Sequence, residues 1–125
     1  MTENDIGEQV IDAAVLVHRE LGPGLLESVY EAVLSHELLG RGGVVERQVS
    51  IPIVYQELKF DEAFRADLIV EKKVIVGLKS VDKLNNAHKK QLLTYLRLSG
   101  LKLGYLLNFS EALMKQGIVR TVKKL

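Results

Sequence analysis

The sequence contains no cysteine, and it has only two prolines in 125 residues. Without cysteine there is no disulfide framework and no thiolate zinc site, which agrees with a reducing compartment. No apolar run approaches the roughly 18–20 residues that a membrane span needs. The acidic first residues, Met1 to Asp5, are unlike the basic start of a signal peptide. We therefore expect a cytoplasmic protein with no membrane partner and, because low-complexity segments and repeats are absent, one domain over residues 1–125.

The net charge is only +1, but it is unevenly distributed along the chain. Residues 1–43 carry eight acidic and two basic side chains, whereas residues 79–125 carry ten basic and two acidic ones. Lys83, Lys90 and Arg97 recur every seven residues and form a predicted basic stripe that could contact substrate phosphates. Such a basic half can attract a polyanion such as nucleic acid. The alternative is a solvated helix face followed by a charged tail.

Hydrophobic periodicity predicts an α/β fold with elements in the order helix-helix-strand-strand-strand-helix-strand. Helices are expected near residues 4–21, 26–39 and 84–99, and strands near 45–55, 58–70, 73–80 and 102–109, with a short additional strand a further option near 117–122. The first three strands would form a meander, and a helix would cross over before the fourth. Pro52 predicts an edge or a bulge in the first strand.

The most informative pattern places an acid and a lysine on neighbouring apolar strands. Asp67 lies in one of these strands and Lys79 in the next. Because side chains alternate between the faces of a strand, Ile75, Gly77 and Lys79 share one face. A charge in the middle of a sheet is costly unless it is paired or binds a metal. The pattern therefore predicts either a buried ion pair or a phosphate-cleaving site.

Three further polar residues occur at positions that could serve such a site. Glu27 opens the second predicted helix, where the helix dipole favours an acid in any case. Gln91 and Tyr95 are four residues apart on the third helix and border its apolar side. They could orient a lysine, a water or a phosphate, or could form a polar rim. The three histidines have no metal-ligand spacing, and no phosphate-binding glycine loop is present.

Several motifs together resemble the GxxExxY protein family of the PD-(D/E)xK nuclease-like superfamily. They cover nearly the whole chain: Gly24-x-x-Glu27-x-x-Tyr30, Glu46-Arg47-Gln48-x-x-Ile51-Pro52-Ile53-x-Tyr55, Phe64-Arg65-Ala66-Asp67-Leu68-Ile69-Val70, Leu78-Lys79-Ser80, His88-x-x-Gln91-Leu92-x-x-Tyr95-Leu96, Gly104-x-x-x-Asn108-Phe109 and Gly117-Ile118-x-Arg120. The resemblance implies a restriction-endonuclease-like core, in which a four-stranded mixed sheet is flanked by helices.

The same resemblance implies roles for individual residues. Asp67 and Glu27 would hold Mg²⁺ or Mn²⁺ together with the acid of an acid-x-lysine motif. Lys79 would position the attacking water or the phosphate, and Gln91 and Tyr95 would assist from the helix that follows. The implied partner is nucleic acid, either DNA or RNA.

The chain departs from the family pattern at Gly77, two residues before Lys79, where the family carries a glutamate. Mg²⁺ prefers six oxygen ligands, and phosphodiester hydrolysis depends heavily on it, so a lost ligand would remove several kcal/mol of transition-state stabilisation. A water could fill the vacant place, or an acid at a strand end, Glu71 or Asp82, could replace the missing one. We expect neither to restore full activity.

Three functions are therefore open from the sequence. The first is a nuclease-fold protein that acts on or binds nucleic acid and is impaired in catalysis. The second is a non-catalytic nucleic-acid-binding module. The third is a protein-interaction or dimerisation domain with a structural Asp67–Lys79 pair; an exposed strand near Ile51–Tyr55 could support a homodimer.

Overall fold

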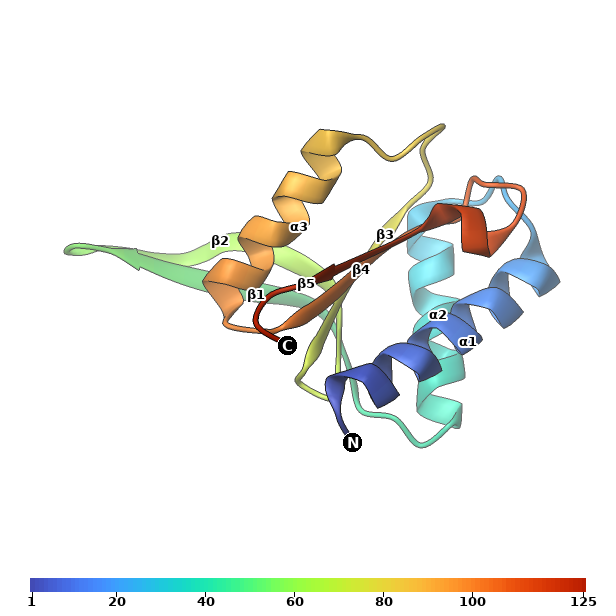
Figure 1. Cartoon of the computed structure of the whole chain (residues 1–125), viewed down its shortest axis with the longest axis horizontal. Coiled ribbons are helices and arrows are strands. Elements are labelled where there is room, and N and C mark those ends of the chain that lie inside the picture. The colour runs from blue at the N-terminus through green and yellow to red at the C-terminus, as the bar shows by residue number, and fades with distance from the viewer.

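The computed structural model describes the whole chain, Met1–Leu125, as three helices around one mixed sheet (Figure 1). The elements are α1 (Glu3–Leu21), α2 (Glu27–Gly40), β1 (Val45–Tyr55), β2 (Leu58–Val70), β3 (Val74–Lys79), α3 (Asn86–Ser99), β4 (Leu103–Asn108), the 3₁₀ turn η1 (Met114–Gly117) and β5 (Ile118–Val122). No helix is both long and apolar enough to cross a bilayer.

The sheet has five strands in the order β1-β2-β3-β4-β5. The pair β3 and β4 is parallel, with α3 as its crossover, and the other three pairs are antiparallel. The predicted mixed α/β sheet is confirmed, but the count of four strands is wrong. The additional strand is β5, whose register begins at Leu103↔Val122. It is only 5 residues long and lies beside a basic tail, so its alternation was too short to be decisive.

The helices divide between the two faces of the sheet. Helices α1 and α2 cover one face, where the core contains Val74, Val76 and Leu78 of β3. Helix α3 covers the other face and packs Leu92 and Leu96 against a second core that includes Ile75. The predicted alternation of β3 is thus confirmed.

The start of α3 is set by a reciprocal cap. The Asn85 side chain accepts a hydrogen bond from the His88 amide at 3.0 Å, and the His88 ring accepts one from the Asn85 amide at 3.2 Å. This capping box satisfies two backbone donors at the helix start. The helix is predicted from Leu84, two residues before its observed start. Of the predicted basic stripe, Lys90 and Arg97 belong to the helix, and Lys83 lies in the loop before it.

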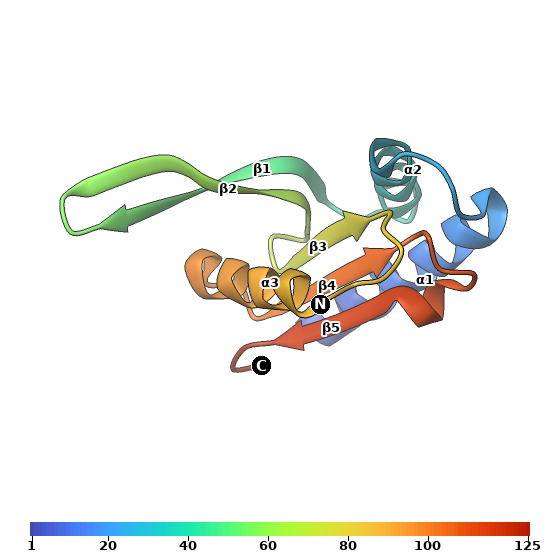
Figure 2. The same ribbon diagram turned by 90° about the horizontal axis from the view of Figure 1, so that it is seen from above.

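The β1–β2 hairpin extends well beyond the rest of the molecule (Figures 1 and 2). Strand β1 is an edge strand, and its register with β2 shifts between Ile51 and Ile53. Ile51 pairs with Phe64, whereas Ile53 pairs with Phe60, so Pro52 lies opposite a bulge in β2. The predicted edge and bulge at Pro52 are both observed, since proline cannot donate to the ladder.

Candidate functional site

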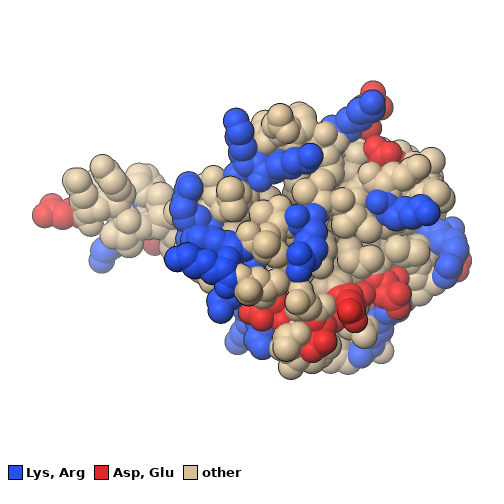
Figure 3. Space-filling view, viewed as in Figure 1, with Lys and Arg blue, Asp and Glu red and all other residues tan.

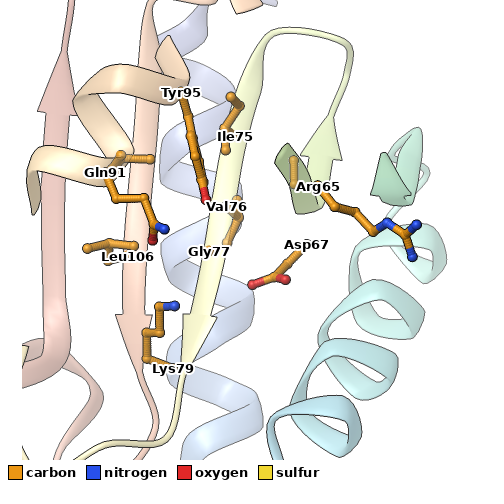
Figure 4. Close-up of a pocket in the computed structure, with 11 residues that line it drawn as sticks. Arg65, Asp67, Ile75, Val76, Gly77, Lys79, Gln91, Tyr95 and Leu106 are labelled. Atoms are coloured by element: carbon orange, nitrogen blue, oxygen red, sulfur yellow. The ribbon is translucent and has the colours of Figure 1, made fainter. Parts of the chain in front are cut away.

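A small cavity of about 70 Å³ lies between β2, β3 and α3. Its lining includes five of the positions singled out in the sequence: Asp67, Gly77, Lys79, Gln91 and Tyr95. Figure 4 shows the Asp67 carboxylate, the Lys79 ammonium, the Gln91 amide and the Tyr95 hydroxyl directed toward the segment around Gly77, whereas Arg65 points away. The fold thus assembles these polar groups around a residue that has no side chain.

Asp67 occupies the point where β2 separates from β3. The two strands pair from Leu68↔Val76 to Val70↔Val74 and no further toward Asp67. The Asp67 carboxylate accepts a hydrogen bond from the Leu78 amide at 2.8 Å, in place of a backbone carbonyl. This bond occupies Oδ2 and fixes the side chain, leaving the other carboxylate oxygen without a protein hydrogen bond.

Burial raises the pKa of Asp67 above its ordinary value, and the Leu78 hydrogen bond opposes this shift. The nearby carboxylates of Glu31 and Glu27 raise the pKa further, while the Lys79 ammonium lowers it. A half-buried acid with a raised pKa in a cavity is typical of a functional site.

Tyr95 is held in place by an aromatic stack. Its ring lies 3.7 Å from that of Phe64 between centroids, with only 3° between the ring planes. Burial raises the pKa of Tyr95, and the Asp67 charge adds to the effect. Tyr95 therefore stays a neutral hydroxyl donor beside the carboxylate. Phe64 was not predicted as a site residue, although it opens the recognised motif Phe64–Val70 that contains Asp67.

Glu27 lies next to this cavity rather than in it. It lines a second cavity of about 280 Å³ that also contains Asp67, Glu31 and Gln48. One carboxylate oxygen of Glu27 accepts a hydrogen bond from the Ser80 amide at 3.0 Å. Asp67 borders both cavities, so it links the Glu27 side of the sheet to the Lys79 side.

Glu31 is the acid that sequence reasoning missed. It is buried and accepts hydrogen bonds from the Arg47 guanidinium at 3.0 and 3.2 Å and from the Gln48 amide. Its spacing of one helical turn from Glu27 could have pointed to it. Because Arg47 and Gln48 occupy both carboxylate oxygens, Glu31 adds negative potential near Asp67 without offering a free ligand.

Tyr30 explains the first recognised motif structurally. The side chain is fully buried and stacks on Phe109, and its hydroxyl donates to the Gly22 carbonyl at 2.5 Å and accepts from the Leu25 amide at 3.1 Å. These bonds shape the loop before α2, in which Gly24 has a left-handed φ of 105°. The loop in turn sets the position of Glu27.

A Tyr30→Phe variant is expected to lose about 1–2 kcal/mol of unfolding free energy, because the Gly22 carbonyl and the Leu25 amide both lose their partner. Denaturant unfolding measures this. A matched control is Tyr55→Phe, which alters an exposed hydroxyl on the hairpin and should leave stability unchanged. Equal stability of Tyr30→Phe and the parent chain would show that the hydroxyl does not hold the loop.

The predicted phosphate-contacting residues Lys83, Lys90 and Arg97 are all exposed, and none forms an ion pair within 4.0 Å. Figure 3 shows basic side chains over the face that carries α3, while acidic side chains form a band along α1. The acidic first part of the sequence and the basic last part therefore lie on different regions of the molecular surface.

The four ion pairs of the structure do not include Asp67 with Lys79. The Lys79 ammonium is close enough to lower the pKa of Asp67, but it makes no direct contact within 4.0 Å. The two residues are therefore arranged around a cavity rather than joined as a structural pair.

The donors at the site do not form a complete Mg²⁺ site. No group of three or more His, Asp or Glu side chains is placed to hold a metal ion. Asp67 and Glu27 each have one oxygen bonded to a backbone amide, and Gly77 offers no oxygen at all. Glu71 is bonded to the Val44 amide at 3.0 Å, and Asp82 lines neither cavity, so neither replaces the missing acid.

The chain matches the model of the PD-(D/E)XK nuclease superfamily over residues 4–121, and it belongs to that superfamily. The match covers almost the whole fold described above, including both cavities. No curated protein and no solved structure matches the chain.

The raised pKa of Asp67 has a consequence for stability. Because the folded pKa lies above the unfolded one, the charged form costs stability at neutral pH, and this cost disappears as the pH falls through the folded pKa. An Asp67→Asn variant is therefore expected to be more stable than the parent at pH 7, by no more than about 1 kcal/mol because the site is partly solvated. The difference should vanish below the ordinary pKa of 3.8.

Denaturant unfolding of both chains across this pH range tests the prediction. If Asp67→Asn is less stable than the parent at pH 7, the carboxylate is a stabilising structural group.

Proposed function

We propose that this chain binds nucleic acid at the surface between β2, β3 and α3, and that its hydrolysis of phosphodiester bonds is impaired. The observation that supports this is the cavity in which Asp67, Lys79, Gln91 and Tyr95 surround Gly77. A carboxylate, an ammonium, an amide and a neutral hydroxyl are suited to a phosphodiester and a water. The polar set has the parts of a phosphate-cleaving site except for one acid. The motifs further support assignment to the GxxExxY family.

In the proposed site, Lys79 donates to a non-bridging phosphate oxygen or to the attacking water. Gln91 and Tyr95 donate hydrogen bonds to the phosphate from α3. Asp67 and Glu27 would hold a metal ion such as Mg²⁺ or Mn²⁺, which would supply activation of a water and stabilisation of charge on the phosphate. Because this chain provides only two acids for the metal, we expect weak metal affinity and slow cleavage.

Nucleic-acid binding is expected to weaken steeply with salt. Contacts from Lys83, Lys90 and Arg97 to duplex DNA predict a slope of about −0.9 in log Kobs against log salt for each phosphate contacted. Fluorescence anisotropy with labelled single- and double-stranded DNA and RNA measures this slope.

A Lys90→Ala variant should reduce the slope by about one contact, or roughly 0.9. Lys115→Ala, on η1 and away from α3, is the matched control and should leave the slope unchanged. Binding to no oligonucleotide, or binding without salt dependence, would contradict the proposal.

A further inference from the structure

The outer part of the β1–β2 hairpin carries an uncovered apolar face. Ile53 pairs with Phe60 and Tyr55 pairs with Leu58, so these four side chains share one face, while Val54 lies on the other. Tyr55, Leu58 and Phe60 are 64%, 60% and 50% exposed. We call residues 53–63 the arm tip.

This apolar face continues the core under α3. Ile51, two residues before Ile53 on β1, and its partner Phe64 belong to that core with Leu92 and Leu96. The hairpin extends beyond the body of the molecule, where no other element covers it (Figure 2). A two-stranded hairpin alone is marginally stable in water, and a contiguous exposed apolar patch marks an interaction site.

Charge argues against nucleic acid as the partner of the arm tip. The segment from Ile53 to Ala63 contains three acids and the single cation Lys59. Glu62 is paired with Arg65 at 2.8 Å, so Glu57 and Asp61 remain as the unpaired acids of the segment. An acidic apolar surface repels phosphates and favours a basic apolar surface on a protein.

The same chain offers a surface of that kind at its C-terminal end. The surface is formed by Lys102, Lys123 and Lys124, and the chain segments 100–110 and 112–125 that carry them contain no acidic residue. The Lys123 amide donates to the Lys102 carbonyl at 2.8 Å, which brings the two segments together. Val122 and Leu125 are 43% and 49% exposed beside them. We call Lys102 and residues 122–125 the C-terminal patch. None of its lysines belongs to the predicted phosphate-contacting set.

We propose that two copies of this chain form a twofold dimer in which each arm tip packs its apolar face on the C-terminal patch of the other copy. The acids of one arm tip then face the lysines of the partner, and the arrangement closes because both contacts are equivalent. Pro52 and the bulge opposite it interrupt the hairpin edges and disfavour open-ended strand pairing. The dimer goes beyond the proposed function and requires no nucleic acid.

Sedimentation equilibrium of the purified chain without nucleic acid is the test. The parent is expected to dimerise, and Leu58→Ser/Phe60→Ser is expected to weaken the dimer at least about tenfold. The control Val54→Ser, on the opposite face of the hairpin, should dimerise like the parent. Thermal unfolding of each variant confirms that the body still folds, since all three side chains are exposed.

A charge exchange identifies the partner surface. Asp61→Lys and Lys124→Glu should each weaken the homodimer, and an equimolar mixture of the two should recover it, because every contact in the mixed dimer is then matched. A parent chain that stays monomeric, a dimer indifferent to the arm substitutions, or a mixture that fails to recover would each overturn the proposal. So would association that occurs only with an oligonucleotide.

Discussion

A Gly77→Glu variant is expected to cut nucleic acid in the presence of Mg²⁺ or Mn²⁺ about a hundredfold or more faster than the parent chain. The substitution supplies the missing acid between Asp67 and Lys79, and recovery of about 3 kcal/mol of transition-state stabilisation corresponds to about a hundredfold in rate. The site can accept it: a Cβ atom at position 77 would lie 3.0 Å from Leu106 Cδ2, the flexible end of a side chain, and 3.9 Å from the Tyr105 carbonyl oxygen.

Two controls separate the chemistry from the fold. Gly77→Gln adds a side chain of the same length without the charge and should stay as slow as the parent. Adding Lys79→Met to Gly77→Glu should abolish the gain, because the ammonium that faces the phosphate is lost. A parent chain that already cuts as fast as Gly77→Glu would show that two acids suffice.

An Asn108→Ala variant is expected to lose about 2–4 kcal/mol of unfolding free energy, which is the largest stability effect that we predict. Asn108 is fully buried and pairs with Lys79 in the parallel ladder. Its side chain accepts from the Val81 and Ser110 amides at 3.1 and 3.3 Å and donates to the Val81 carbonyl at 2.8 Å. The truncation leaves these backbone groups without their partner.

The same substitution should disturb the site, because Asn108 fixes the loop directly after Lys79. In the Gly77→Glu background we expect Asn108→Ala to reduce cleavage, even at temperatures where the variant is folded. Asn86→Ala, at an exposed position in the first turn of α3, is the control and should change stability by less than about 0.5 kcal/mol. Unchanged stability of Asn108→Ala would show that water replaces the side chain.

The face of β3 was predictable because the period of a strand is two residues. Ile75, Gly77 and Lys79 were placed together from spacing alone, and the structure places Gly77 and Lys79 beside the same cavity. The same rule does not tell how the strands separate at Asp67, which is a tertiary effect. Its hydrogen bond to Leu78 therefore could not be predicted from the pattern.

The rest of the site depends on long-range packing. In the sequence, Glu31 does not differ from other helical glutamates. Its contacts with Arg47 and Gln48 exist only in the folded chain. In the sequence, Asn108 only lies near the end of a predicted strand. Its role depends on the hydrogen bond that its side chain makes to the Val81 carbonyl, in a loop that is distant in the sequence. The last strand was expected only as an option near residues 117–122 for a different reason: the 5 residues of β5 carry too little alternation to distinguish a strand from a tail.

The most direct test of the central claim, that Gly77 leaves a nuclease site one acid short, is the affinity for Mn²⁺ measured by titration calorimetry. We expect weak binding by the parent chain, binding at least about tenfold tighter by Gly77→Glu, and loss of that gain when Asp67→Asn is added. Equal affinity of the parent and Gly77→Glu, or a gain that survives Asp67→Asn, would contradict it.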